Sequence, residues 1–250
     1  MRDEGEYLYG IIGTNEARNF GPIGLGGQEV ETIACRDLSA VISRASLGKH
    51  RVSKENLLAH EQVLERVMEA HTVLPVKFGT IAVNTEEIRR LLEQRYRELK
   101  HLLRDMDGKV ELGVKAFWRD MDLIFREIVD ENESIKRLKE EIAARPSRQT
   151  HAQRIAIGQT VQAVLEAKKE REGEDLLRGL KRISVDYRLN RTIGDKMLLN
   201  AAFLVDRARE KEFDDLMTRL DLRCRQRIKF AYVGPVPAYN FVNIALHADG

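Results

Sequence analysis

The residues best suited to metal binding or acid–base chemistry are four histidines and one glutamate in the first half of the chain: His50, His60, Glu61, His71 and His101. On a continuous helix His60 and His71 would be three turns, or ~16 Å, apart, whereas a metal–nitrogen bond is ~2 Å long. One ion therefore cannot bridge them. Because His60 falls on an apolar helix stripe, we expect it to be buried and hydrogen-bonded to the backbone or to a carboxylate.

The other residue types that carry chemistry form no recognisable site. No serine lies in a nucleophile elbow, and Cys35 and Cys224 are far apart and lack a neighbouring base, so we expect two reduced thiols. The glycine-rich loop Thr14 to Gly27 lacks the Gly-Lys-Ser/Thr ending of a phosphate-binding loop, and no helix follows it directly. We expect Lys77 to point toward solvent or an acidic partner. The sequence thus predicts no catalytic residue, cofactor or metal ion, and a protein that is not an enzyme.

A predicted helix–strand unit, Ser53 to Ile81, carries His60, Glu61, His71 and Lys77. Ser53 can cap the helix, and apolar residues then recur at spacings of three and four. Val73 to Ile81 is rich in β-branched residues, and Pro75 restricts it to a strand start or an edge. The unit predicts one helix with a buried face, followed by one strand.

Residues 1–107 are predicted to form an N-terminal α+β domain with a small, mostly antiparallel sheet and two helices. The second helix runs from an Asn84 cap to about Met106 and stops at Asp107-Gly108. Two helices usually cover one face of such a sheet, so the other face or an edge is expected to be left for a partner. The remaining predicted strands are Tyr7 to Gly13, Gln28 to Cys35 and Leu38 to Ser43.

Residues 108–250 are predicted to form a second domain with the order β-α-β-β-α-β, that of a ferredoxin-like sandwich. Its first helical part is a long charged pair, Met121 to Ile183, broken at Arg145-Pro146. A tail from Gly234 to Leu246 is expected to start extended and to end as an edge strand or a packed strap. The other predicted elements are Val110 to Trp118, Ser184 to Leu189, Met197 to Val205, Arg209 to Leu222 and Arg227 to Val233.

Composition argues against nucleic acid and membrane partners. The 250 residues carry a formal net charge of +2 with 33% charged residues, so no strongly basic field is present. No apolar run approaches the length of a membrane span, and the acidic N-terminus does not resemble a signal peptide. We therefore expect a soluble cytoplasmic protein.

Three segments carry a family resemblance. They are Tyr7-Leu8-Tyr9-Gly10-Ile11, the helix with His60-Glu61 followed by Leu-Pro-Val-Lys-Phe-Gly-Thr, and the closing Gly234 to Val242. The chain resembles the GvpF/GvpL family of gas vesicle proteins, although Val236 and Ala238 stand where the family usually has Trp and Pro. The resemblance implies a minor structural or assembly protein of the gas vesicle that binds the main shell protein GvpA and other accessory Gvp proteins.

Two further expectations follow. An alternative function is RNA binding on a ferredoxin-like sheet, but Tyr187 and Phe203 on its predicted central strands lack the Gly-Phe-rich signature of such modules. The most family-like segment lies in residues 1–107, so we expect these residues to bind GvpA about as well as the whole chain and residues 108–250 to bind it poorly.

Overall fold

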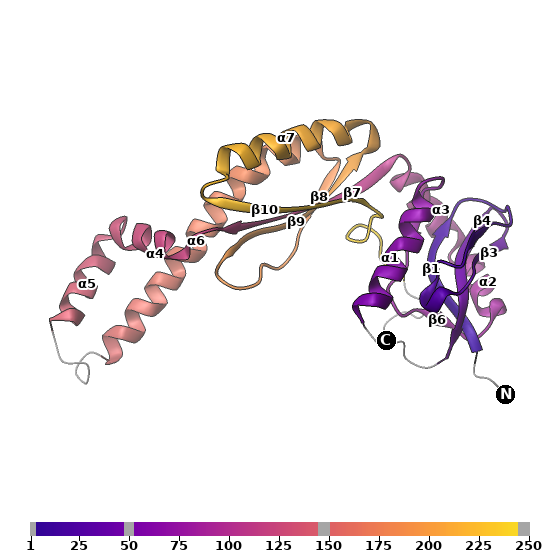
Figure 1. Ribbon diagram of the computed structural model, residues 1–250, viewed down its shortest axis with the longest axis horizontal. Helices are drawn as coiled ribbons and strands as arrows, with labels where there is room; N and C mark the ends of the chain where they lie inside the picture. The colour runs from indigo at the N-terminus through magenta and orange to yellow at the C-terminus, as the bar shows by residue number, and fades with distance from the viewer. Residues whose placement is uncertain (1–3, 48–52, 145–150, 245–250) are drawn as a thin grey trace. The chain divides into compact units, whose positions relative to one another are not determined.

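The computed structural model describes residues 4–47, 53–144 and 151–244, which form two separate β-sheets with helices (Figure 1). The protein is therefore of mixed α+β class. The predicted domains, 1–107 and 108–250, stay a prediction. By internal contacts the first unit comprises Met1–Leu112, Leu204–Ala208 and Gly234–Gly250, and the second comprises Gly113–Phe203 and Arg209–Val233.

The sheet of the first unit has the strand order β2-β3-β4-β1-β5, and β6 also pairs with β1. All its recorded pairings are antiparallel. The predicted single strand Val73 to Ile81 is wrong, because the chain leaves the sheet between β5 and β6 through a turn in which Gly79 has a φ of 83°. The elements are β1 (Glu4–Ile12), β2 (Asn19–Gly21), the 3-10 turn η1 (Leu25–Gly27), β3 (Val30–Cys35), β4 (Leu38–Ser46), β5 (Val73–Pro75) and β6 (Ile81–Ala82).

The helices of this unit are α1 (Lys54–Met68), α2 (Thr85–Gln94) and α3 (Tyr96–Met106). Both predicted caps are confirmed: Ser53 Oγ accepts from the N–H of the third residue after it at 3.2 Å, and Asn84 Oδ1 does the same at 3.0 Å. The single helix predicted from Asn84 to Met106 is wrong. It is broken at Arg95, whose φ of −99° and ψ of 13° are not helical.

Helices lie on both faces of this sheet. Tyr7 and Tyr9 of β1 pack with the apolar stripe of α1, whereas Leu8 and Ile11 pack with the leucines of α2 and α3. The expectation that two helices cover only one face is therefore wrong. Helices α2 and α3 cover one face of the sheet and α1 covers the other. The sheet is therefore a buried middle layer.

The tail as far as Ile244 also packs in the first unit. Ala238, Val242 and Ile244 are buried in the same core cluster as the leucines of α2 and α3. Of the two structures expected for the tail, the packed strap is the one observed for residues 237–244, while residues 245–246 lie outside the described residues. We had expected the tail to belong to the second domain. Its apolar side chains pack in the core of the first unit instead.

The sheet of the second unit has the strand order β10-β7-β9-β8. Helix α7 lies against one face, where the Phe213 ring is tilted against Phe203 and stacked on Tyr232, with ring centroids 5.3 and 5.9 Å apart. On the other face Val233 is 58% exposed. The elements are β7 (Lys109–Trp118), β8 (Asp186–Leu189), β9 (Met197–Asp206), η3 (Arg207–Arg209), α7 (Glu210–Cys224) and β10 (Ile228–Val236).

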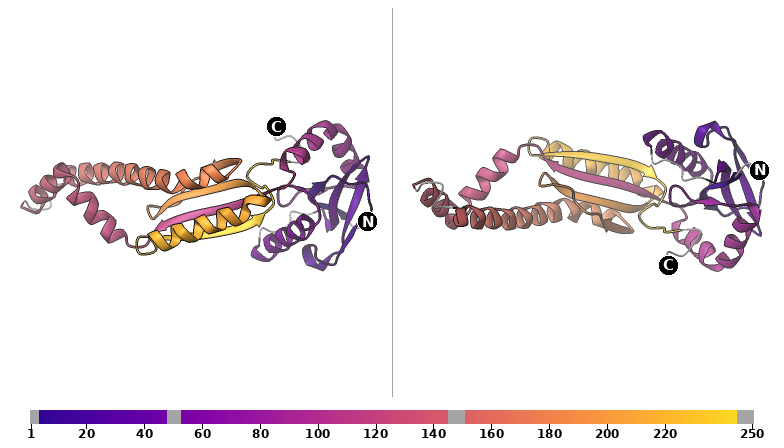
Figure 2. Two further views of the ribbon diagram at one scale, coloured as in Figure 1. Left: turned by 90° about the horizontal axis from the view of Figure 1, so that it is seen from above. Right: turned by 90° about the horizontal axis from the view of Figure 1, so that it is seen from below.

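Within the described residues three helices connect β7 to β8, and the first two both contact the long third one (Figure 2). They are α4 (Met121–Asp130), α5 (Glu133–Ala143) and α6 (His151–Ile183). The predicted break at Arg145-Pro146 lies outside the described residues. The predicted first helical segment is two helices, because the chain turns at Asn132, whose side chain donates to the Ile128 carbonyl at 2.7 Å.

Charged side chains join these helices to the end of the sheet. Arg227 donates to both carboxylate oxygens of Glu127 at 2.7 and 2.8 Å and to Glu172 at 2.7 Å. Lys168, only 5% exposed, lies 3.1 Å from Glu127, and Trp118 Nε1 donates to Glu172 at 2.8 Å. The hydrogen bonds from Arg227 are the main reason why the pKa of Glu127 is lowered to about 2.

Replacing Glu127 with Gln should lower the free energy of unfolding at neutral pH by about 1–3 kcal/mol, because two partly buried cations lose a charged acceptor. Since folding lowers the pKa of Glu127 from 4.5 to about 2, its contribution is present above pH 4.5 and is lost as the pH falls through 2. Urea denaturation at neutral and acidic pH measures both effects. The control is Glu140→Gln, an exposed residue of α5; equal losses in the two variants would contradict this role.

Candidate functional site

The three segments that carry the family resemblance meet in the first unit. In the loop between β5 and β6, Val76 N–H donates to the Tyr9 carbonyl and Gly79 N–H to the Tyr7 hydroxyl, both at 2.9 Å. This loop, α1 and the tail enclose a cavity of about 340 Å³, which we call the α1–tail pocket. Its lining residues are Leu57, His60, Glu61, Pro75, Val76, Lys77, Phe78, Tyr239, Val242, Asn243 and Ile244.

His60 forms part of the pocket wall and is confirmed as a buried, hydrogen-bonded histidine. Its Nδ1 lies 3.0 Å from the Tyr7 hydroxyl, and its ring also hydrogen-bonds to the backbone of Val76. Burial lowers the pKa of His60 to about 4, so the ring is neutral at neutral pH. A neutral imidazole has one N–H; if that N–H donates to the Val76 carbonyl, Nδ1 accepts from Tyr7. Both ring nitrogens of His60 therefore make hydrogen bonds within the protein, and neither is available to a substrate.

The mouth of the pocket is charged, whereas its walls are mostly apolar. Glu61 and Lys77 are exposed, as expected for Lys77, and neither has an ion-pair partner among the described residues. Leu57 on α1 is 38% exposed. The hydroxyl of Tyr239 is buried without a hydrogen-bond partner in the part of the chain that the structure describes, and burial raises its pKa. The pocket can therefore accept an apolar group flanked by charges of both signs.

A buried carboxylate anchors the tail beside this pocket. Glu111 of β7 is only 4% exposed and accepts from the backbone N–H of Asn240 at 2.7 Å and from its side-chain Nδ2 at 2.6 Å. Burial raises the pKa of Glu111, and the two hydrogen bonds from Asn240 oppose that rise. The bond pair fixes the tail at the residue next to Tyr239.

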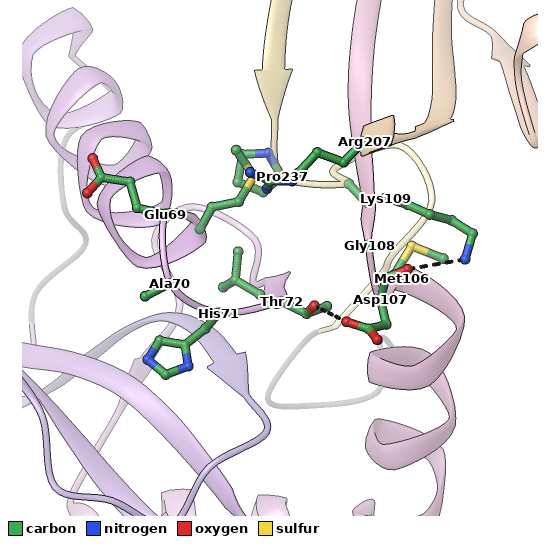
Figure 3. A pocket seen from close by; sticks show the side chains of 13 residues that line it. Glu69, Ala70, His71, Thr72, Met106, Asp107, Gly108, Lys109, Arg207 and Pro237 are labelled. Carbon is green, nitrogen blue, oxygen red and sulfur yellow. Dashed lines mark hydrogen bonds between the residues drawn. The ribbon is translucent and has the colours of Figure 1, made fainter. Parts of the chain in front are cut away.

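A second cavity, of about 290 Å³, lies where α3 ends (Figure 3). Thr72 Oγ1 donates to Asp107 Oδ1 at 2.9 Å, and Lys109 Nζ donates to the Asp105 carbonyl at 2.8 Å. The lysine contact satisfies a carbonyl at the end of the helix, where backbone carbonyls lack helical partners. The Thr72 bond joins the segment between α1 and β5 to the residue that follows α3.

The histidines considered for metal binding do not assemble. His71 and His101 line an open depression of about 900 Å³ beside α3, where Arg104 donates to His101 Nδ1 at 2.6 Å, and His50 lies outside the described residues. No group of three potential metal ligands is found within the described ranges. In the same ranges no helix is long and apolar enough to cross a membrane. Cys35 and Cys224 are free and half-buried.

The aromatic residues of the RNA-binding alternative do not form an exposed platform. Phe203 is fully buried, and Tyr187 stacks on it with ring centroids 6.4 Å apart. Lys181 of α6 lies over the Tyr187 ring at 4.6 Å. Both rings face the helices, whereas RNA-binding sheets stack bases on exposed aromatics.

Sequence reasoning identified His60 and Lys77 but did not predict the pocket. The residues that it missed are the tail side chains Tyr239, Val242 and Ile244, which are separated from α1 by most of the chain. Their mixture of aromatic and branched aliphatic side chains indicated burial. It did not indicate which surface they cover.

Substituting His60 with Gln should make stability less dependent on pH between about 6.5 and 4. Folding lowers the pKa of His60 to about 4 from 6.5, so the unfolded chain binds the proton more tightly and acid favours unfolding, by up to ~3 kcal/mol at pH 4. Chemical denaturation across this pH range, compared with His101→Gln at an exposed site, measures the slope. Parallel stability profiles for wild type and His60→Gln would contradict a buried neutral histidine.

Curated relatives match nearly the whole chain. Gas vesicle protein F of Nostoc sp. is 28% identical, with 96% of this chain and 99% of that protein covered. Gas vesicle protein F1 of Halobacterium salinarum is 25% identical, with coverages of 97% and 95%. Gas vesicle protein L of Streptomyces sp. is 27% identical, with coverages of 90% and 87%.

Solved structures show the same fold. The crystal structure of GvpF from Anabaena sp. superposes with a TM-score of 0.84 at 27% identity, covering 97% of this chain and 99% of that one. GvpF from Microcystis aeruginosa gives a TM-score of 0.78 at 25% identity, with coverages of 95% and 98%. The family model described as gas vesicle synthesis protein GvpL/GvpF matches residues 5–243. The chain therefore belongs to the GvpL/GvpF family of gas vesicle synthesis proteins.

Proposed function

We propose that this chain is a minor structural or assembly protein of the gas vesicle, which binds the shell protein GvpA and other accessory Gvp proteins in the cytoplasm during vesicle formation. The observation that carries the proposal is the α1–tail pocket, because two of the three family-like segments line it and the third, through Tyr7 and Tyr9, is hydrogen-bonded to its wall. A protein that holds a very hydrophobic shell subunit needs accessible apolar surface rather than a catalytic cleft.

We further propose that the protein turns over no substrate. The polar groups at the pocket already serve the fold: His60 binds Tyr7 and the Val76 backbone, and Glu111 binds Asn240. A general base or nucleophile needs a free, correctly placed partner. The pocket is suited to apolar contacts rather than to catalysis.

We propose that GvpA docks on the first unit. The sequence led to the same expectation, but the surface now proposed is a different one. Since helices lie on both sheet faces there, the α1–tail pocket and the exposed leucines beside it replace the open face as the proposed surface. Residues 1–107 alone would lack the tail side chains that form part of this pocket. The proposal therefore concerns the whole chain.

For the second unit we propose a ferredoxin-like architecture with an inserted helical pair. Its chain order, with the strand order β10-β7-β9-β8, supports this assignment. The helices α4 to α6 are rich in charged residues, which suits contacts with other accessory Gvp proteins better than it suits contacts with an apolar shell subunit.

We expect the affinity-tagged full chain, co-expressed with GvpA, to retain GvpA through purification in moderate salt. Hydrogen–deuterium exchange of the complex should show new protection in α1 and residues 237–244, because a docked partner excludes solvent there. A tagged protein of similar size that is unrelated to gas vesicles is the control.

Three outcomes would contradict the proposal. They are no retention of GvpA, protection confined to α4–α6, and tight RNA binding that persists in moderate salt. The last would favour the RNA-binding alternative, since nonspecific attraction to phosphates weakens as salt is added.

A further inference from the structure

The α1–tail pocket differs from the other cavities in what its walls offer a ligand. The second cavity lies at a capped helix end, and the depression beside α3 carries Arg97, Lys100 and Arg104. Apolar side chains from α1, the β5–β6 loop and the tail dominate the α1–tail pocket. They are Leu57, Pro75, Val76, Phe78, Tyr239, Val242 and Ile244.

The volume limits the size of the group that can enter. At about 340 Å³ the pocket is near the lower end of the ~300–1,000 Å³ range of small-molecule sites. The imidazole of His60 is neutral and already hydrogen-bonded, so it offers neither a charge nor a free donor to an anion. The pocket fits a single bulky aliphatic or aromatic group.

The surroundings of the pocket favour a protein segment over a free apolar molecule. Leu57 and Leu58, on the first turns of α1, are 38% and 45% exposed, so apolar surface continues outside the cavity. Glu61 lies one helical turn further along α1, and Lys77, in the β5–β6 loop, also lines the pocket. Neither charge has an ion-pair partner among residues 4–47, 53–144 and 151–244. An amphipathic segment with both charge signs would cover the leucines and pair both charges.

We propose that the α1–tail pocket seats one bulky apolar side chain from an amphipathic segment of the shell protein, with basic and acidic residues of that segment pairing with Glu61 and Lys77. This inference rests on the proposed function, since it names the part of GvpA that the first unit recognises. The apolar side chain is the anchor because it is fully desolvated, whereas the charges at the rim set orientation and association rate.

The test uses the full chain, with tagged GvpA as the probe and biolayer interferometry as the readout. Leu57→Glu places a carboxylate at the apolar mouth, and Lys77→Glu reverses one rim charge; both side chains are exposed, so neither change opens the core. We expect each to weaken GvpA binding about 10-fold or more. The matched control is Leu222→Glu on α7, where the leucine is 61% exposed. It should bind as wild type does, and thermal unfolding verifies that all three variants fold.

Each result decides between the two proposals. If wild type binds GvpA and both pocket variants bind equally well, the pocket assignment is wrong while the proposed function stands. If folded wild type does not bind GvpA at all, both fail. If Leu57→Glu instead abolishes self-association, measured by sedimentation velocity, without weakening GvpA binding, the occupant is a second copy of this chain and the shell-protein assignment is overturned.

Discussion

Packing of the tail into the first unit is the constraint on which the rest of this unit depends. Ala238, Val242 and Ile244 are buried with the leucines of α2 and α3, and burial of a valine or isoleucine side chain contributes roughly 1.5–3 kcal/mol. The Glu111 carboxylate is buried at the same place and needs the two hydrogen bonds from Asn240 to offset its desolvation. Without the tail, the pocket would lose one wall and Glu111 would lose its donors.

The two units bury polar groups of different kinds, which makes them sensitive to different conditions. The first unit supplies uncharged partners to its buried polar side chains: Tyr7 pairs with His60, Tyr9 with Ser43 at 2.9 Å, and the Glu111 carboxylate with the Asn240 amide. The second uses ionised ones, with Arg227 at the centre. Acid charges a neutral histidine at a higher pH than it neutralises a carboxylate held by a guanidinium. The polar cluster of the first unit therefore weakens before that of the second as the pH falls.

Local patterns in the sequence predicted the elements well where one side-chain period dominates. The stripe that ends at Val67 gave α1, and the Ser53 and Asn84 caps were recognised because a single side chain makes each of them. The break at Arg95 was not predicted, since no proline or glycine marks it and the apolar spacing continues through it. Helices α2 and α3 nevertheless cover the same sheet face, so the error about the layers came from α1, which packs on the opposite face.

The pocket shows the limit of the same reasoning. His60 was correctly assigned to the core because its helix position alone places it on the buried stripe. Tyr239 and Val242 could not be assigned to the same site, because contacts between residues so far apart leave no periodic signal in either segment. The resemblance of three separate segments to one family was the only sequence feature that linked them. It gave no information on how the segments are arranged in space.

The predicted boundary at Gly108 and the two units defined by internal contacts do not coincide. Gly108 does end α3, with a φ of 65°, as its sequence suggested. However, Glu111 lies beyond it and still belongs to the first unit, and the chain returns there at Leu204–Ala208 and Gly234–Gly250. Strands β7, β9 and β10 each contribute residues to both units. Residues 1–107 lack the tail that lines the proposed docking pocket, so loss of GvpA binding by that fragment would report on incomplete folding as much as on the position of the docking surface.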